Sequence, residues 1–326
     1  MLSPTIYFFH DLRNDYVKNN LTKSNDKKDI ITKKKETVHH VVSSNFFSMN
    51  EIVIANKIRE LKSKHFYIFD KAERLKIGEI GPYNLDANIV KSNAHRILLS
   101  FVKKDLVYFD AYLAALSSSK KYIFQLIEGY RSLLASINLL VSNQIIHNGL
   151  NLDTIVFSKI PILTNFSFAI NLQNTGFNWS QYFLQRKLDK FCPVEFYLLQ
   201  YQLTNNQVLS VYNIETIIKQ FIKDHRQDIT DINVSYFAKY ANKSFTLNME
   251  EALKYWKTWD NYALSMVFLD ILKNYFNKTD NKFISYFMKL LVDNICLDPS
   301  KRCLPNISLF EDMLQNLEFK DFREII

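Results

Sequence analysis

Residues 145–170 read IIHNGLNLDTIVFSKIPILTNFSFAI, and the rest of the chain is best interpreted from this stretch. A short apolar run leads to His147, and a β-type run, Ile155-Val156-Phe157, begins eight residues later. A turn with Pro161 and a second apolar run follow, and they end in Asn165-Phe166-Ser167. Short runs of β-branched and aromatic residues between turn residues are typical of strands. The stretch therefore predicts two short buried strands joined by a tight turn, with a polar loop on either side.

In order and spacing, this stretch resembles the catalytic centre of a protein kinase, where the loop H-R-D-L-x-x-x-N precedes a β-hairpin and the triplet D-F-G. The framework positions that match are His147, Leu150, Ile155 and Phe166. The resemblance implies an α+β, two-lobed protein-kinase-like fold, with a small β-rich lobe that contains one helix and a larger, mostly α-helical lobe.

The positions that carry the chemistry of a kinase hold other residues in this chain. Phosphoryl transfer uses an Asp that accepts the proton of the substrate hydroxyl, and an Asn and a second Asp that hold metal ions. The base, the family's nearby Lys, the Asn and the D-F-G Asp are replaced, in that order, by Gly149, Asn151, Thr154 and Asn165. The motif's Arg and its last Gly are replaced by Asn148 and Ser167. The resemblance thus implies a catalytically inactive member of the family, a pseudokinase.

The N-terminal part departs from the family as well. An active kinase carries a glycine-rich loop there, because glycine lets backbone N–H groups close over the phosphates, whereas this chain has five glycines and none before Gly78. The strand lysine of the family has two placements. Lys33 follows Ile30-Ile31-Thr32; alternatively Val38–Val42 is the equivalent strand and the lysine is missing, which leaves Lys33 in a solvated basic turn.

Residues 46–63 are apolar at helical spacing and resemble the regulatory helix of the small lobe, with Ser48 as the expected N-cap. Glu51 stands where the resemblance places an ion-pairing glutamate. If Lys33 is its partner, a remnant ion pair survives. If not, Glu51 is an ordinary first-turn acid that the helix dipole favours.

Three anchors of the large lobe follow the hairpin in the family's order. An activation-type segment runs from Ser167 to Cys192-Pro193-Val194-Glu195, which resembles A-P-E. The sequence that starts at Asp260 resembles D-x-W-S-L-G, and Leu297–Arg302 resembles D-P-x-x-R. The resemblance implies a buried ion pair between Glu195 and Arg302, and an Asp260 carboxylate that accepts hydrogen bonds from the loop at His147.

We expect a small lobe over residues 1–101 and a large lobe over 102–326, with Phe101-Val102-Lys103-Lys104 as the hinge between them. Strands are expected near 66–69, 75–80 and 96–101, and helices near 105–116 and 120–143. An insertion at about 196–258 separates the first two anchors, with helical patterns at Ile214–Asp224 and Met249–Trp259. Its aromatic residues are either interface anchors or the core of added helices: Tyr201, Tyr212, Tyr236, Phe237, Tyr240, Tyr255 and Trp256.

The composition and charge of the chain limit its expected partners and its expected compartment. The 41 basic and 33 acidic residues give a net charge of +8 without a concentrated basic block, so nucleic acid is not expected as the main partner. The three cysteines have no metal spacing, and a reducing compartment is expected. Charge interrupts the first residues too early for a signal peptide, and no apolar run of about 18 residues would span a membrane. We expect an intracellular protein that binds no membrane and no metal.

Two functions are consistent with these residues. The first is an inactive binding, scaffold or regulatory module, without a cofactor, whose partner is a protein such as an active kinase or a structural assembly. The alternative is an atypical serine/threonine protein kinase that uses ATP and Mg²⁺ through rearranged side chains, with Asp153 and Asn165 touching the metal. The divergence is similar to that of kinase-like proteins of large DNA viruses, which would place the chain in the host cytoplasm or the virion.

Overall fold

The structure is a computed structural model that describes residues 37–75, 96–229, 234–275 and 282–319. The chain forms two compact units. Among the described residues, the first unit runs to Ser136 and also contains Leu152–Ala169, and the second contains Ile137–Asn151 and the residues from Ile170 onward. The first unit thus includes more than the expected small lobe of residues 1–101. Lys33 and residues 76–80 of the expected strand lie outside the described residues.

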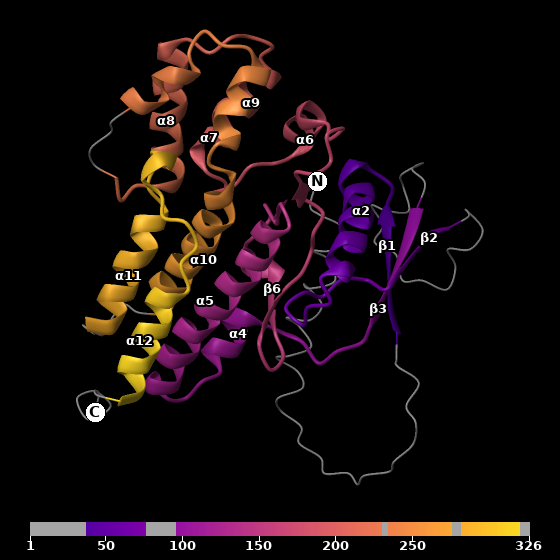
Figure 1. Ribbon diagram of the computed structural model, residues 1–326, viewed down its shortest axis with the longest axis vertical. Coiled ribbons are helices and arrows are strands. Elements are labelled where there is room, and N and C mark those ends of the chain that lie inside the picture. The colour runs from indigo at the N-terminus through magenta and orange to yellow at the C-terminus, as the bar shows by residue number, and fades with distance from the viewer. Residues whose placement is uncertain (1–36, 76–95, 230–233, 276–281, 320–326) are drawn as a thin grey trace. The chain divides into compact units, whose positions relative to one another are not determined.

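The first unit contains a three-stranded antiparallel sheet in the order β1–β3–β2 (Figure 1). Its strands are β1 (Thr37–Ser43), β2 (Lys71–Leu75) and β3 (Arg96–Val102). Nearly all of the central strand β3 is buried, including its apolar run Ile97-Leu98-Leu99. Residues 38–42, the second placement of the family's lysine strand, lie in β1 directly before helix α2.

Helix α2 (Phe46–Glu60) starts at Asn45 and not at Ser48. The Asn45 side chain accepts the Ser48 N–H at 3.0 Å, and the Ser48 hydroxyl accepts the Asn45 N–H at 2.9 Å, which is a capping box. Ser48 is therefore the third residue of the helix. Glu51 lies beyond the first turn and its side chain is buried, so its interpretation as a first-turn acid is wrong.

The predicted hairpin is confirmed. Strands β6 (Ile155–Phe157) and β7 (Pro161–Leu163) pair in antiparallel orientation, and β4 (Val107–Tyr108) pairs with the other edge of β6. The 3₁₀ helix η2 (Leu152–Thr154) precedes them. No strand forms at 66–69. There the chain meets β7 through a single bridge, in which the Tyr67 N–H donates to the Leu163 carbonyl at 2.9 Å.

Helices α4 (Phe109–Ala114) and α5 (Ser119–Ser142) correspond to the two expected over 105–116 and 120–143. Gly129 allows the close packing of α5 on α4, because a Cβ atom at this position would overlap the ring of Phe109. One apolar core joins the sheet, α2 and the hairpin. Its members include Val42, Ala55, Leu99, Phe101, Tyr108, Val156 and Ile162.

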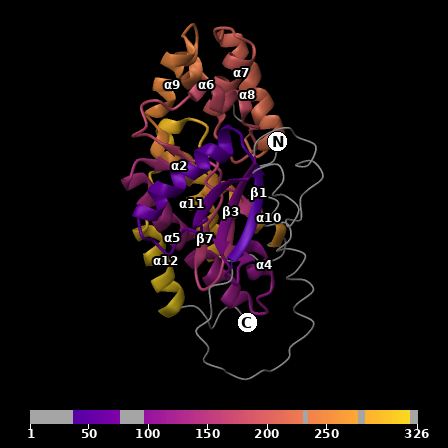
Figure 2. The same ribbon diagram turned by 90° about the vertical axis from the view of Figure 1, so that its right-hand side faces the viewer.

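In the second unit, β5 (Ile145–Ile146) pairs with β8 (Ile170–Asn171). The other regular elements that the structure describes in this unit are helices. Its helices are α6 (Trp179–Gln185), α7 (Val194–Thr204), α8 (Val211–His225), η3 (Ser235–Tyr240), α9 (Phe245–Leu253), η4 (Trp256–Thr258), α10 (Trp259–Tyr275), α11 (Lys282–Asn294), η5 (Pro299–Lys301) and α12 (Ser308–Phe319). Figures 1 and 2 show α7, α8 and α9 together at one end of this unit. Within the described ranges, no helix has the length and apolar character to cross a bilayer.

Candidate functional site

The loop after β5 is held by one buried carboxylate. Asp260, at the start of α10, accepts the His147 N–H through Oδ2 and the Asn148 N–H through Oδ1, both at 2.7 Å. Burial raises the pKa of the Asp260 carboxyl to about 6, although the two backbone donors lower it. The contacts expected between Asp260 and this loop are therefore present.

Within the same loop, His147 has a structural position. Its side chain is fully buried, and its Nδ1 accepts the Gly149 N–H at 3.3 Å. Asn148 has a φ of 52°, in the left-handed region that asparagine adopts more readily than most residues. At Gly149 the loop has no side chain that could accept a proton from a substrate hydroxyl.

Thr154, Asn165, Phe166 and Ser167 belong to the first unit. Thr154, at the end of η2, is buried. Its carbonyl accepts two hydrogen bonds from Thr164, from the backbone N–H at 3.0 Å and from the side-chain hydroxyl at 3.2 Å. Asn165 has a φ of 58°, and its side-chain oxygen accepts the hydroxyl of Ser167 at 2.7 Å. The carboxamide oxygen of Asn165 is thus bonded within its own loop.

A residue that sequence reasoning missed fastens this loop to α2. The Asn50 amide donates to the carbonyls of Ser167 at 2.9 Å and Ala169 at 2.7 Å. An edge-to-face ring contact between Phe47 of α2 and Phe168 supports the same attachment, and Phe66, in the chain after α2, makes another with Phe166. The one signal in the sequence is the place of Asn50 beside Glu51 in the regulatory-type helix.

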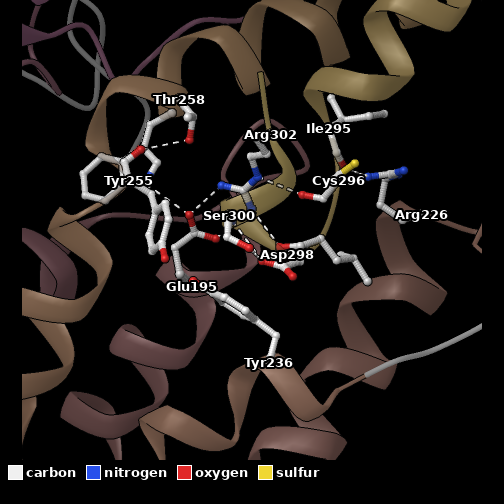
Figure 3. Close-up of polar contacts among 12 residues, drawn as sticks. Glu195, Arg226, Tyr236, Tyr255, Thr258, Ile295, Cys296, Asp298, Ser300 and Arg302 are labelled. Atoms are coloured by element: carbon white, nitrogen blue, oxygen red, sulfur yellow. Dashed lines mark hydrogen bonds and ion pairs between the residues drawn. The ribbon is translucent and has the colours of Figure 1, made fainter. Parts of the chain in front are cut away.

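Figure 3 shows the ion pair expected between Glu195 and Arg302. The guanidinium donates to both carboxylate oxygens, at 2.6 and 2.9 Å, and both side chains are fully buried. The Trp259 indole N–H also donates to Glu195 at 3.1 Å, and Arg302 Nε donates to the Cys296 carbonyl at 2.8 Å. These additional bonds satisfy the pair, as burial of two charges requires.

A cavity of about 520 Å³ lies beside this ion pair. The insertion contributes Arg226 and Tyr236 to its wall, and the chain around η5 contributes Cys296, Asp298 and Lys301. Arg226 is already engaged, because it donates to the Ile295 carbonyl at 2.6 Å (Figure 3). It also donates to Asp228 at 2.8 Å. In the part of the chain that the structure describes, no three His, Cys, Asp or Glu side chains are grouped to hold a metal ion.

The aromatic residues of the insertion divide between the two interpretations. Phe237 and Tyr240 are fully buried and are core residues, whereas Tyr212 is 76 % exposed. The Lys239 ammonium lies 3.5 Å from the ring centroid of Tyr236 and 5.0 Å from that of Tyr255, and it pairs with Glu251 at 2.7 Å. This contact joins η3 to α9 and η4. Other exposed apolar side chains of the insertion are Val208 and Val211, close to Tyr212 in the sequence, and Leu247 on α9.

The structure therefore brings His147, Asn148 and Gly149 together with Asp260 in the second unit, and Thr154, Asn165, Phe166 and Ser167 together in the first. Asn151 is partly exposed beside η2. The chain matches no protein-family model and no curated protein.

Proposed function

We propose that this chain is a catalytically inactive protein-kinase-like protein, a two-lobed pseudokinase, that acts as a binding or scaffold module for a protein partner. The observation that carries the proposal is the engagement of Asn165. Its neutral side-chain oxygen accepts the Ser167 hydroxyl, where the family has a carboxylate that holds Mg²⁺.

The chemistry of the family gives this replacement its weight. Phosphoryl transfer is catalysed by positioning and by charge stabilisation, and the metal ions and the base supply most of both. Gly149 offers no base, and amide oxygens are weaker ligands for Mg²⁺ than carboxylates. His147 and Asp260 remain, but their contacts serve the shape of the loop.

The backbone at the end of β3 also argues against a nucleotide as ligand. Binding pockets commonly orient a ligand through backbone N–H and C=O groups. At Val102, in the expected hinge, the N–H donates to the Asp70 carboxylate at 3.1 Å, and the carbonyl accepts the Tyr67 hydroxyl at 2.8 Å. Both groups of Val102 thus already have side-chain partners.

The binding role rests on the insertion. Insertions on rigid scaffolds commonly carry binding functions. Exposed apolar side chains occur on the loop before α8, on the first turn of α8 and on α9, at Val208, Val211, Tyr212 and Leu247. A protein partner, such as an active kinase or a structural assembly, fits an apolar surface better than a nucleic acid does.

The test is transfer of radiolabelled phosphate from Mg²⁺-ATP to the protein itself and to a mixture of peptide substrates. We expect no incorporation above that of a heat-denatured sample. Incorporation that disappears in an Asn165→Ala variant would overturn the proposal in favour of the atypical kinase. As a second readout, Mg²⁺-ATP should leave the melting temperature unchanged, whereas a ligand at 100 times its dissociation constant stabilises by about 2.7 kcal/mol.

A further inference from the structure

Residues 170–192, which we call the α6 segment, contain β8 and α6 and end just before Pro193 and α7. In an activation segment that switches, order is commonly obtained by phosphorylation, because the added phosphate pairs with an arginine. The arginine that matters in this segment is its own residue Arg186, which directly follows α6.

Arg186 lies inside the second unit. Its side chain is buried, and its guanidinium lies between the rings of Tyr182 and Phe196, 5.4 and 5.5 Å from their centroids. It donates one hydrogen bond to the Tyr182 hydroxyl and another to Cys192 Sγ at 3.1 Å. The cation thus connects α6, the end of the segment and the first turn of α7.

Neighbouring elements hold the same residues. Gln200 of α7 donates to the carbonyls of Phe183 at 2.7 Å and Arg186 at 2.6 Å. From the loop after β5, the Asn148 amide donates to the Tyr182 hydroxyl at 2.5 Å, while the Asn148 N–H donates to Asp260. The α6 segment is therefore bonded to α7 on one side and, through Asn148, to the start of α10 on the other.

A buried cation is costly unless it keeps its partners, so the chain has to remain folded around Arg186. Burial raises the pKa of the Cys192 thiol to about 12, even though Arg186 lowers it, and the sulfur remains a neutral acceptor at physiological pH. The rings of Tyr182 and Phe196 surround the guanidinium where an added phosphate would have to approach.

We propose that Arg186 keeps the α6 segment ordered permanently, so that the order of this segment does not depend on phosphorylation. The device is a conformational lock built from residues that the proposed function does not use. It therefore stands or falls independently of whether the chain transfers phosphate.

Hydrogen exchange of the full chain, read by mass spectrometry with and without phosphatase treatment, tests the lock. Backbone amides in peptides that cover residues 179–192 should be protected to the same extent in both samples. Arg186→Gln should speed their exchange by about tenfold or more, since local opening follows the loss of its bonds. Lys187→Gln is the matched control, because Lys187 is the next residue and is exposed, and its exchange should stay at the wild-type rate.

Tyr182→Phe keeps the ring and removes only the hydroxyl that Asn148 and Arg186 share. It should raise exchange in the same peptides by less than Arg186→Gln does, and it decides the matter if Arg186→Gln fails to fold. Faster exchange of the wild-type segment after phosphatase treatment would overturn the proposal. Two other results would also overturn it. One is wild-type protection in both variants. The other is wild-type protection in Tyr182→Phe when Arg186→Gln misfolds.

Discussion

Asparagine side chains make several of the bonds that shape the loops of this molecule. Asn148 and Asn165 both have positive φ values, 52° and 58°; the Asn165 side chain bonds Ser167 in its own loop, whereas that of Asn148 bonds Tyr182 of α6. Asn50 donates to two loop carbonyls from α2. An amide can position a loop in this way, but it neither takes up a proton near neutral pH nor carries the charge that holds Mg²⁺. These three asparagines therefore position loops without adding a charge or a group that titrates near neutral pH.

Loss of one partner of the buried ion pair should be severe. Arg302→Ala leaves the Glu195 carboxylate buried without its cation, which costs about 3–5 kcal/mol. Urea unfolding followed by tryptophan fluorescence measures the change in the free energy of unfolding. Lys301→Ala is the control, because this neighbouring residue is exposed and should change stability by less than about 0.5 kcal/mol. Equal unfolding midpoints for the two variants would contradict the role given to the pair.

His40 should make stability depend on pH. Burial, and to a lesser extent His39, lower the pKa of His40 from 6.5 to about 4. Between these values the unfolded chain binds a proton that the folded chain does not, so folded stability is present above pH 6.5 and is lost as the pH falls toward 4. Wild type should lose about 1–2 kcal/mol more than His40→Gln between pH 7 and pH 5.

Asp260 acts in the opposite direction, because its raised pKa makes the folded chain gain stability as the pH falls from about 6 toward 3.8. Both proteins contain Asp260, so its effect cancels when wild type is compared with His40→Gln. Parallel curves of unfolding free energy against pH for the two would show that His40 is not the titrating group.

At the scale of elements, the hairpin and the long helices could be predicted because their signals are local. Short apolar runs between turn residues mark β6 and β7, and apolar spacing marks α2 and α5. The start of α2 could not be placed, because Asn45 and Ser48 both suit an N-cap and only their reciprocal bonds decide between them. Residues 66–69 do not form the expected strand, because they pair with β7 through a single bridge.

The hydrogen bonds of Asn50 should stabilise helix α2 and the loop after β7 against unfolding. Asn50→Leu removes two hydrogen bonds and leaves the carbonyls of Ser167 and Ala169 without this donor, which costs about 1–3 kcal/mol. Asn56→Leu, at an exposed position of the same helix, is the control and should have little effect. Thermal unfolding followed by circular dichroism gives both values. If Asn50→Leu lowers thermal stability no more than Asn56→Leu does, the Asn50 hydrogen bonds do not stabilise the attachment.

At the scale of the whole molecule, a contact between distant residues could be predicted only where each of the two residues lies in a recognisable sequence motif. Glu195, Asp260 and Arg302 each lie in a recognisable short pattern, and their contacts are present. Asn50, Arg186 and Lys239 lie in no such pattern, because amide clamps and buried cations depend on the residues that the fold brings to them. For the same reason, the sequence could not tell the buried Phe237 and Tyr240 of the insertion from the exposed Tyr212.

The exposed apolar residues of the insertion should carry partner binding. A triple variant with Val208→Ser, Tyr212→Ser and Leu247→Ser should keep the wild-type melting temperature, since these side chains are at least half exposed. It should lose the protein cross-links that the wild type forms in its native setting. A triple variant at the exposed positions Lys219, Lys223 and Lys254 is the control. If the apolar variant keeps every cross-link, the binding surface lies outside this end of the insertion.

The ion pair of Figure 3 also has a consequence for the birth of the protein. Glu195 leaves the ribosome 107 residues before Arg302. At a synthesis rate of about 5–20 residues per second, its carboxylate waits roughly 5–20 seconds for its cation. All residues of the first unit precede Ile170, so this unit is fully synthesised before either partner of the ion pair. The two units should therefore mature one after the other, and the second, with its helices made but its closing charge still to come, is the part that a chaperone would need to shelter.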